Sequence, residues 1–174
     1  MSDTKQMEMI AENLISHFLQ RHGILIAKPY FDQEAGDLFG ITTEGGLRFC
    51  RIQCKGRTLR PGAKSSVTIS VNVNLKSLVV CLFIDDGSFD GLNLFVFFAD
   101  DIQKWPKNRS GEKYVLNIAH DTFVNELKAN KVSQQTIDRI GNEIMKAELP
   151  TTAHYKFTGS GGVNIGGSSA TDMR

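Results

Sequence analysis

Apolar residues recur at helical spacing near the start of the chain. Between Thr4 and His22 they form one stripe, and Gly23 follows where a left-handed helix cap is needed. The stripe consists of Met7, Ile10, Ala11, Leu14 and Phe18, flanked by Ile15 and Leu19. This spacing predicts an amphipathic helix over residues 4–22.

Strand-like patterns fill the middle of the chain. Polar and apolar side chains alternate over residues 66–75, which is typical of a strand with one buried face. Pro29 ends the first strand-like run, and a glycine-rich turn joins the second to the third. The predicted strands cover residues 24–27, 37–43, 47–55, 66–75, 78–84 and 94–99.

Helical patterns return towards the C-terminus. A helix is predicted to begin near Ala99 and to stop before Pro106, because proline ends helices. A strand near 113–118 and helices near 121–129 and 133–149 complete the predicted elements. The order of elements predicts an α/β or α+β fold, with an N-terminal helix followed by a central mixed β-sheet flanked by helices.

The chain divides into a folded part and a tail. We expect one domain over residues 1–150, with a core at about 4–105 and a C-terminal helical part at 106–150. Residues 151–174 are rich in glycine and serine and carry little apolar surface. Such a segment does not fold alone, so we expect it to be flexible or to dock on a partner.

Composition narrows the classes of function. The chain has 174 residues, 41% of them hydrophobic and 22% charged, with a formal net charge of +1. This excludes a globally basic protein, so any nucleic-acid surface must come from local clustering of charge. The longest apolar runs, at 78–84 and 94–99, are too short to cross a bilayer, so we expect no membrane partner.

The three cysteines predict buried thiols rather than a disulfide or a metal site. Cys50 and Cys54 lie roughly 13 Å apart along one predicted strand, which exceeds the reach of a disulfide. Their spacing is not CxxC, and no histidine lies nearby in sequence. We expect small core residues in a reducing compartment, and therefore a cytoplasmic protein.

The heptapeptide RIQCKGR at 51–57 has an unusual polar face for a buried strand. Successive side chains of a strand alternate between faces, so Arg51, Gln53 and Lys55 lie on one side. Burying polar groups at the end of a strand costs free energy unless something there uses them. The segment is therefore either a sheet edge in contact with solvent or a site.

The preceding turn decides what lies beside this polar face. A three-residue loop at 44–46, with a glycine in the left-handed region, would pair Thr43 with Leu47. Counting back, this register places Asp37 opposite Gln53 and beside Lys55. A loop one residue longer or shorter would set Asp37 on the other face. We predict the three-residue register, with an acid, an amide and an ammonium within a few ångströms.

These residues carry a resemblance to a known family. The order of helical Glu12, Asp37 in GDLFGI, and Gln53 and Lys55 in RIQCK resembles the PD-(D/E)XK nuclease superfamily, over roughly residues 4–105. That resemblance implies a restriction-endonuclease-like core, with the acidic residue and the (D/E)-x-K element on adjacent strands. It implies an endonuclease that hydrolyses phosphodiester bonds of DNA with Mg²⁺ or Mn²⁺.

The resemblance also implies roles for the residues. Asp37, the side-chain oxygen of Gln53 and the backbone carbonyl of Cys54 would ligate the ion, with Glu12 acting directly or through water. Lys55 would orient the attacking water or offset charge on the phosphate.

The chain departs from the family pattern at two positions. Gly36 stands where the family name has proline, and Gln53 replaces the second carboxylate. With one negative charge fewer, the site should hold Mg²⁺ more loosely.

Each residue also has a structural interpretation. Glu12 would be a solvated residue at the border of the helix stripe, and Asp37 a common turn residue. Lys55 would be a lysine on an edge strand, where it discourages aggregation.

A basic segment adjoins the predicted site. No Asp or Glu lies between Leu47 and Ser66, whereas this interval holds Arg48, Arg51, Lys55, Arg57, Arg60 and Lys64. Such a block is normally a solvated face. Next to the predicted site, it predicts phosphate contacts from Arg51, Arg57, Arg60 and Lys64, which would weaken with salt.

Three functions stay open at this point. The first is a DNA endonuclease, and a double-strand cut would usually need two active sites, which favours a homodimer. The second is a catalytically inactive nuclease-fold protein that binds nucleic acid or a protein partner. The third is an interaction module that uses the apolar strand at 94–99 and the glycine-rich tail.

Overall fold

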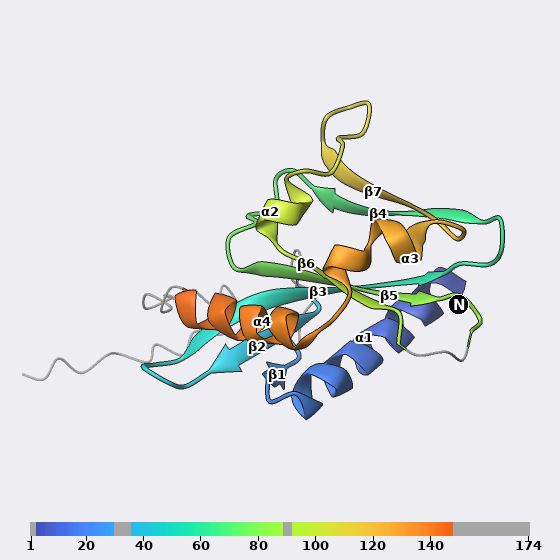
Figure 1. The fold of residues 1–174 in the computed structure, drawn as a ribbon. Helices are drawn as coiled ribbons and strands as arrows, with labels where there is room; N and C mark the ends of the chain where they lie inside the picture. The colour runs from blue at the N-terminus through green and yellow to red at the C-terminus, as the bar shows by residue number, and fades with distance from the viewer. Residues whose placement is uncertain (1–2, 30–35, 89–91, 148–174) are drawn as a thin grey trace, which may run out of the picture.

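The computed structural model describes residues 3–29, 36–88 and 92–147 (Figure 1). Its helices are α1 (Asp3–Arg21), α2 (Ala99–Ile102), α3 (Phe123–Glu126) and α4 (Gln134–Lys146), with a 3₁₀ turn at Lys128–Asn130. Its strands are β1 (Leu25–Ala27), β2 (Leu38–Thr42), β3 (Arg48–Thr58), β4 (Lys64–Ser70), β5 (Leu78–Asp85), β6 (Leu94–Phe97) and β7 (Lys113–Ala119).

A mixed sheet of five strands forms the centre of the fold, in the order β1-β2-β3-β5-β6. The pairing is antiparallel except between β3 and β5, which run parallel. Strands β4 and β7 form a separate antiparallel pair. The predicted class is confirmed in its coarse form: the protein is α+β, with an N-terminal helix and a mixed sheet flanked by helices.

Two apolar cores lie on opposite faces of the central sheet. Helices α1 and α4 pack on one face, together with Cys50, Ile52 and Cys54 of β3. The β4–β7 pair and the segment from α2 to α3 cover the other face (Figure 1). All three cysteines are buried free thiols, as the sequence predicted for small core residues.

The buried stripe of α1 differs from the predicted one. Ala11, Ile15 and Leu19 are fully buried, whereas Ile10 is 41% exposed. Ala11 of the predicted stripe and its flanking residues Ile15 and Leu19 thus form the buried face, which is rotated away from Ile10. The cause is Gly56 of β3: a Cβ atom there would lie 2.9 Å from the Cβ of Ala11 and closer still to the Met7 carbonyl oxygen. Only a glycine lets the helix lie this close.

The hairpin between β2 and β3 confirms the predicted register. The paired residues run from Thr42 opposite Arg48 to Leu38 opposite Ile52, as a three-residue loop requires. Gly45 and Gly46 both have positive φ angles, which glycine adopts without steric cost.

The neighbours of β3 change along its length. Residues 48–52 pair with β2, and residues 51–58 pair with β5. We call residues 48–52 the β2-paired half and residues 53–58 the β5-paired half.

Some boundaries differ from the predicted ones. Strand β3 continues beyond Lys55 to Thr58, because β5 pairs with it there. The strand predicted over 66–75 ends at Ser70; Ser77, before β5, has a positive φ of 54°. The helix predicted near 121–129 is α3 followed by the 3₁₀ turn. The end of the last predicted helix and the tail at 151–174 lie outside the described residues.

Within the described ranges, none of the helices combines the length and the apolar character that a membrane span needs.

Candidate active site

One cavity of about 220 Å³ gathers residues from helix α1, the start of β2 and the β5-paired half of β3. Glu12, Asp37 and Lys55, which the sequence predicted to lie together, all line it. Asp37 and Lys55 therefore border the same cavity. The other lining residues are Lys5, Glu8, Met9 and Cys54.

Asp37 takes over the role of a missing strand partner. The pairing of β2 with β3 ends at Leu38, so the next backbone groups of β3 on that side need other partners. The Asp37 N–H donates to the Ile52 carbonyl at 3.1 Å. The Cys54 N–H donates to Asp37 Oδ2 at 2.6 Å. The hydrogen bond fixes the carboxylate at the end of the hairpin, beside the cavity.

The electrostatic surroundings of Asp37 are mixed. Burial raises the pKa of its carboxyl above the ordinary value, and the negative charges of Glu12 and Glu8 act in the same direction. The hydrogen bond from the Cys54 N–H and the positive charge of Lys55 oppose this shift. A nearby cation would favour the charged carboxylate, because it would offset both the burial and the acidic neighbours.

Glu12 is partly buried and already has a partner. Its Oε1 forms an ion pair with the Lys28 ammonium, on the segment that leaves β1. The Glu12 side chain is 20% exposed and the Lys28 side chain 66%. Glu12 is therefore more than a solvated border residue, since it lines a cavity and holds a counter-ion.

Lys55 lies on the middle strand of the central sheet, so it is not a lysine of an edge strand. At its level, however, β3 has a paired strand only on the β5 side. Among the described residues it forms no ion pair. Its positive charge lowers the pKa of Asp37, against the larger effect of burial. Lys55 thus lines the cavity without an ion-pair partner among the described residues.

Gln53 does not line this cavity. Its Oε1 is buried and has no hydrogen-bond partner in the described part of the chain. An unpaired buried acceptor costs free energy. The predicted register therefore holds for the hairpin, but the structure does not bring the Gln53 oxygen to the cavity with Glu12, Asp37 and Lys55. Burial raises the pKa of the Cys54 thiol well above the ordinary value.

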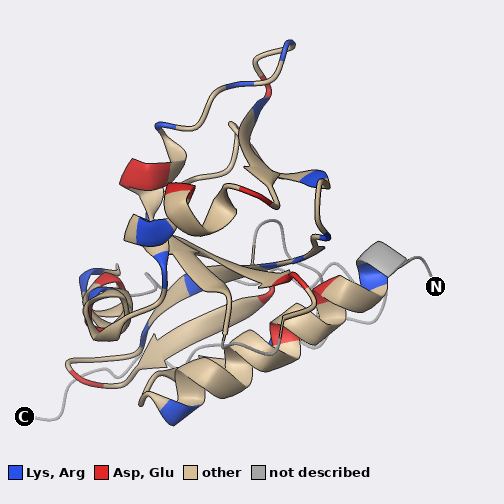
Figure 2. Cartoon of the chain, turned by 45° about the vertical axis from the view of Figure 1, so that its right-hand side comes forward, with Lys and Arg blue, Asp and Glu red and all other residues tan. Residues whose placement is uncertain are grey.

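Sequence reasoning missed three charged residues around the cavity. Lys5 and Glu8 lie seven and four positions before Glu12, which places all three on one face of α1. Helical spacing was a sufficient signal for these two. Figure 2 shows the mixture of acidic and basic positions along this helix. The third, Lys28, had no signal in the sequence, because its contact with α1 depends on how β1 packs.

The arginines of the basic segment hold backbone carbonyls in place. Arg51 donates to the Asn74 and Lys76 carbonyls, before β5. Arg57 donates to the Ser66 carbonyl at 2.9 Å and lies 3.6 Å from Glu8 Oε1.

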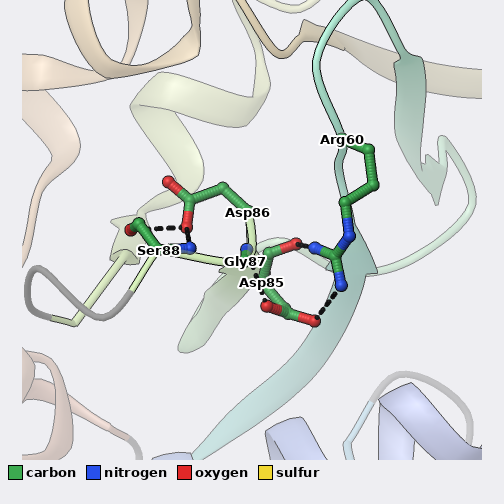
Figure 3. A network of polar contacts seen from close by, with 5 residues as sticks. All are labelled: Arg60, Asp85, Asp86, Gly87 and Ser88. Atoms are coloured by element: carbon green, nitrogen blue, oxygen red, sulfur yellow. Dashed lines mark hydrogen bonds and ion pairs between the residues drawn. The ribbon is translucent and has the colours of Figure 1, made fainter.

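Arg60 and Lys64 are the other two residues that were predicted to contact phosphate. Arg60 donates to both the carbonyl and the carboxylate of Asp85, at 2.9 and 3.1 Å (Figure 3). Lys64, at the start of β4, is exposed. Three of the four predicted phosphate contacts, at Arg51, Arg57 and Arg60, thus already have partners within the protein.

Comparison with protein-family models, with curated proteins and with solved structures gave no significant match for the chain. Within the described ranges, no group of three or more His, Cys, Asp and Glu side chains has the arrangement of a metal site.

Proposed function

We propose that the protein is a Mg²⁺- or Mn²⁺-dependent endonuclease that hydrolyses phosphodiester bonds of DNA. The supporting observation is the convergence of Glu12, Asp37 and Lys55, from three separate elements, on one cavity. Acids on a helix and a strand end, with a lysine on the next strand, form the arrangement expected of a restriction-endonuclease-like core. The α+β topology, with helix α1 followed by an antiparallel β1–β2–β3 meander, supports the same proposal.

The residues present fit a divalent ion that arrives together with the substrate. Mg²⁺ is usually held by one or two carboxylates and by substrate phosphates, rather than by a closed protein cage. Asp37 and Glu12 supply the two carboxylates, and the Asp37 Oδ2 is already fixed by the Cys54 N–H.

The residues of the cavity would have separate roles in the reaction. A bound divalent ion would polarise the phosphodiester and favour ionisation of a water molecule. Asp37 and Glu12 would hold that ion. Lys55 would donate a hydrogen bond to the attacking water or to a phosphate oxygen, where negative charge builds up. Water adds to phosphorus and one P–O ester bond breaks, which leaves a nick with a hydroxyl and a phosphate end.

Cleavage of supercoiled plasmid and of single strands, with Mg²⁺ or Mn²⁺, tests the proposal. Asp37→Asn keeps an acceptor for the Cys54 N–H, and Lys55→Met keeps the apolar stem, so both should fold. Each should lower the rate of nicking by about 100-fold or more. Lys104→Met, in an exposed position outside the cavity, is the control and should leave the rate unchanged. Nicking that survives both site substitutions would indicate a contaminating nuclease and remove the proposal.

A second candidate is a nuclease-fold protein that has lost catalysis and binds nucleic acid. The observation in its favour is that Glu12 is paired with Lys28 and that the arginines hold backbone carbonyls. Of the described basic residues in the cavity and the basic segment, Lys5, Lys55 and Lys64 are then left to contact phosphate. Salt-sensitive DNA binding without nicking, weakened by Lys55→Met and Lys64→Met, would favour this candidate. Double-strand cuts by the first candidate would usually need two active sites, which favours a homodimer.

A further inference from the structure

Lys28 stands in the electrostatic field of both proposed metal-binding carboxylates. Its ammonium contacts Glu12 directly. Lys28 follows the last residue of β1, which pairs with β2, and β2 begins directly after Asp37. The hydrogen bond and the charge of Glu12 raise the pKa of Lys28, and the charge of Asp37 adds to this effect. The lysine is therefore held by one of the two carboxylates that a divalent ion would need, Glu12, and attracted by the other, Asp37.

The exposure of the two partners indicates that this ion pair can open. The Lys28 side chain is mostly exposed, whereas Glu12 is mostly covered. Ion pairs at the surface contribute little net free energy, because water solvates the separated charges well. Departure of the ammonium would leave Glu12 facing the cavity with Glu8 and Asp37.

We infer that Lys28 is a built-in competitor of the divalent ion, whose ammonium occupies Glu12 until the ion displaces it. This inference rests on the proposed function, because it takes Glu12 and Asp37 as metal-binding residues. Lys28 and Lys55 then have opposite roles at one site. Lys55, which forms no ion pair among the described residues, serves the substrate, and Lys28 keeps the ion-free site neutral.

The test is Mn²⁺ binding to the full-length protein without nucleic acid. The electron paramagnetic resonance signal of free Mn²⁺ measures how much of the ion is bound. Lys28→Met removes the ammonium and keeps the stem, so Mn²⁺ should bind about three- to tenfold more tightly. Lys28→Gln is a second neutral variant and should behave alike. Lys28→Arg restores the ion pair and should return the dissociation constant to the wild-type value.

Two controls make the result specific. Lys5→Met also removes one positive charge, from the lining of the cavity, and leaves the pair between Lys28 and Glu12 intact, so its effect should be smaller. In the background of Glu12→Gln, Lys28→Met should give no gain, because the competing ion pair is made with Glu12. The inference is overturned if Lys28→Met equals Lys5→Met, if Lys28→Met still tightens Mn²⁺ binding in the Glu12→Gln background, or if neither wild type nor Lys28→Met binds Mn²⁺.

Plasmid nicking, measured on the same proteins, separates this inference from the proposed function. Tighter Mn²⁺ binding by Lys28→Met without nicking by any variant would keep the competitor role and reject the nuclease. Nicking by wild type, with equal Mn²⁺ binding by wild type and Lys28→Met, would keep the nuclease and reject the competitor role.

Discussion

The two halves of β3 are built alike but used differently. Both place alternate side chains under a helix, and a glycine lets that helix approach: Gly40 of β2, opposite Cys50, meets Ile144 of α4, and Gly56 meets α1. In the β2-paired half, backbone groups find partners across a regular hairpin. In the β5-paired half, the pairing with β2 has ended, so the edge of β3 that faces away from β5 has no paired strand in the described part of the chain.

This difference determines where charged side chains gather. When a strand ends and its neighbour continues, the exposed backbone groups need other donors and acceptors. The Asp37 carboxylate fills that role for the Cys54 N–H, and Glu12 and Lys55 lie around it. In the β2-paired half the charged residue Arg48 instead binds the Met145 and Ala147 carbonyls at the end of α4. One half therefore contains a candidate site, and the other fastens a helix.

Substitution at Gly56 should give the largest effect, because it separates α1 from the β5-paired half. In Gly56→Ala, the new methyl group would overlap the backbone of Met7 and the side chain of Ala11, which cannot rotate away. We expect the free energy of unfolding in urea to fall by about 3 kcal/mol. Glu8 and Glu12 would move with the helix, so any Mn²⁺ binding should weaken as well.

Gly141→Ala is the matched control for Gly56→Ala. A Cβ atom at Gly141, within α4, has no heavy atom within 4 Å. Alanine is the better helix former, so this variant should gain about 0.5–1 kcal/mol. Equal effects at the two positions would show that α1 does not depend on close approach to β3.

The next effect concerns the hydrogen bond that replaces the missing strand. Asp37→Ala leaves the Cys54 N–H without its acceptor and should lower the free energy of unfolding by about 1–2 kcal/mol. Asp37→Asn keeps an acceptor and removes a charge beside Glu12, so its stability at pH 7 should equal that of wild type or exceed it. Urea unfolding of both variants measures the difference. Equal losses would show that Asp37 supports the fold by its charge.

A smaller effect is expected at Gly40, the counterpart of Gly56 in the β2-paired half. There a Cβ atom would meet Ile144 Cδ1 at 2.8 Å, which is the end of a flexible side chain. The isoleucine can adopt another rotamer, so Gly40→Ala should cost about 1 kcal/mol. A loss as large as that of Gly56→Ala would mean that α4 packs as rigidly as α1.

Local chemistry explains what the sequence could predict. The register of the β2–β3 hairpin follows from Gly45 and Gly46 and from alternation along the strands, so it required no knowledge of distant contacts. The buried face of α1 could not be predicted in the same way. Met7 and Ile10 looked as apolar as Ile15, and the choice among them depends on Gly56, which is distant in sequence.

In the candidate site, too, local patterns could be predicted from the sequence and contacts between distant segments could not. Glu12, Asp37 and Lys55 were predicted from the resemblance and the hairpin register, and all three line the cavity. The arginines were predicted to bind phosphate because of the lack of acids around them in sequence. Their actual acceptors are carbonyls such as those of Asn74 and Ser66, which come close only when β4 and the turn before β5 are in place.

The smallest effect is expected at the far end of the β5-paired half, where Thr58 pairs with Asp85. The hydrogen bond from Arg60 lowers the pKa of Asp85, and the Gly87 N–H adds to this shift. A carboxyl with a lowered pKa in the folded state stabilises the protein above the unfolded-state pKa of about 3.9. This contribution is lost as the pH falls through the folded-state pKa.

Asp85→Asn removes the charge and keeps an acceptor for the Gly87 N–H, so it isolates this ion pair. Both partners are partly exposed, and we expect a loss of only about 0.5 kcal/mol at pH 7. Urea unfolding between pH 7 and the acid range should show the variant and wild type converging as Asp85 becomes protonated. Arg60→Met should cause a similar loss, and Arg60→Met combined with Asp85→Asn should lose less than the sum. If Asp85→Asn causes no loss at pH 7 while Arg60→Met does, the arginine holds this end of β3 through the Asp85 carbonyl alone.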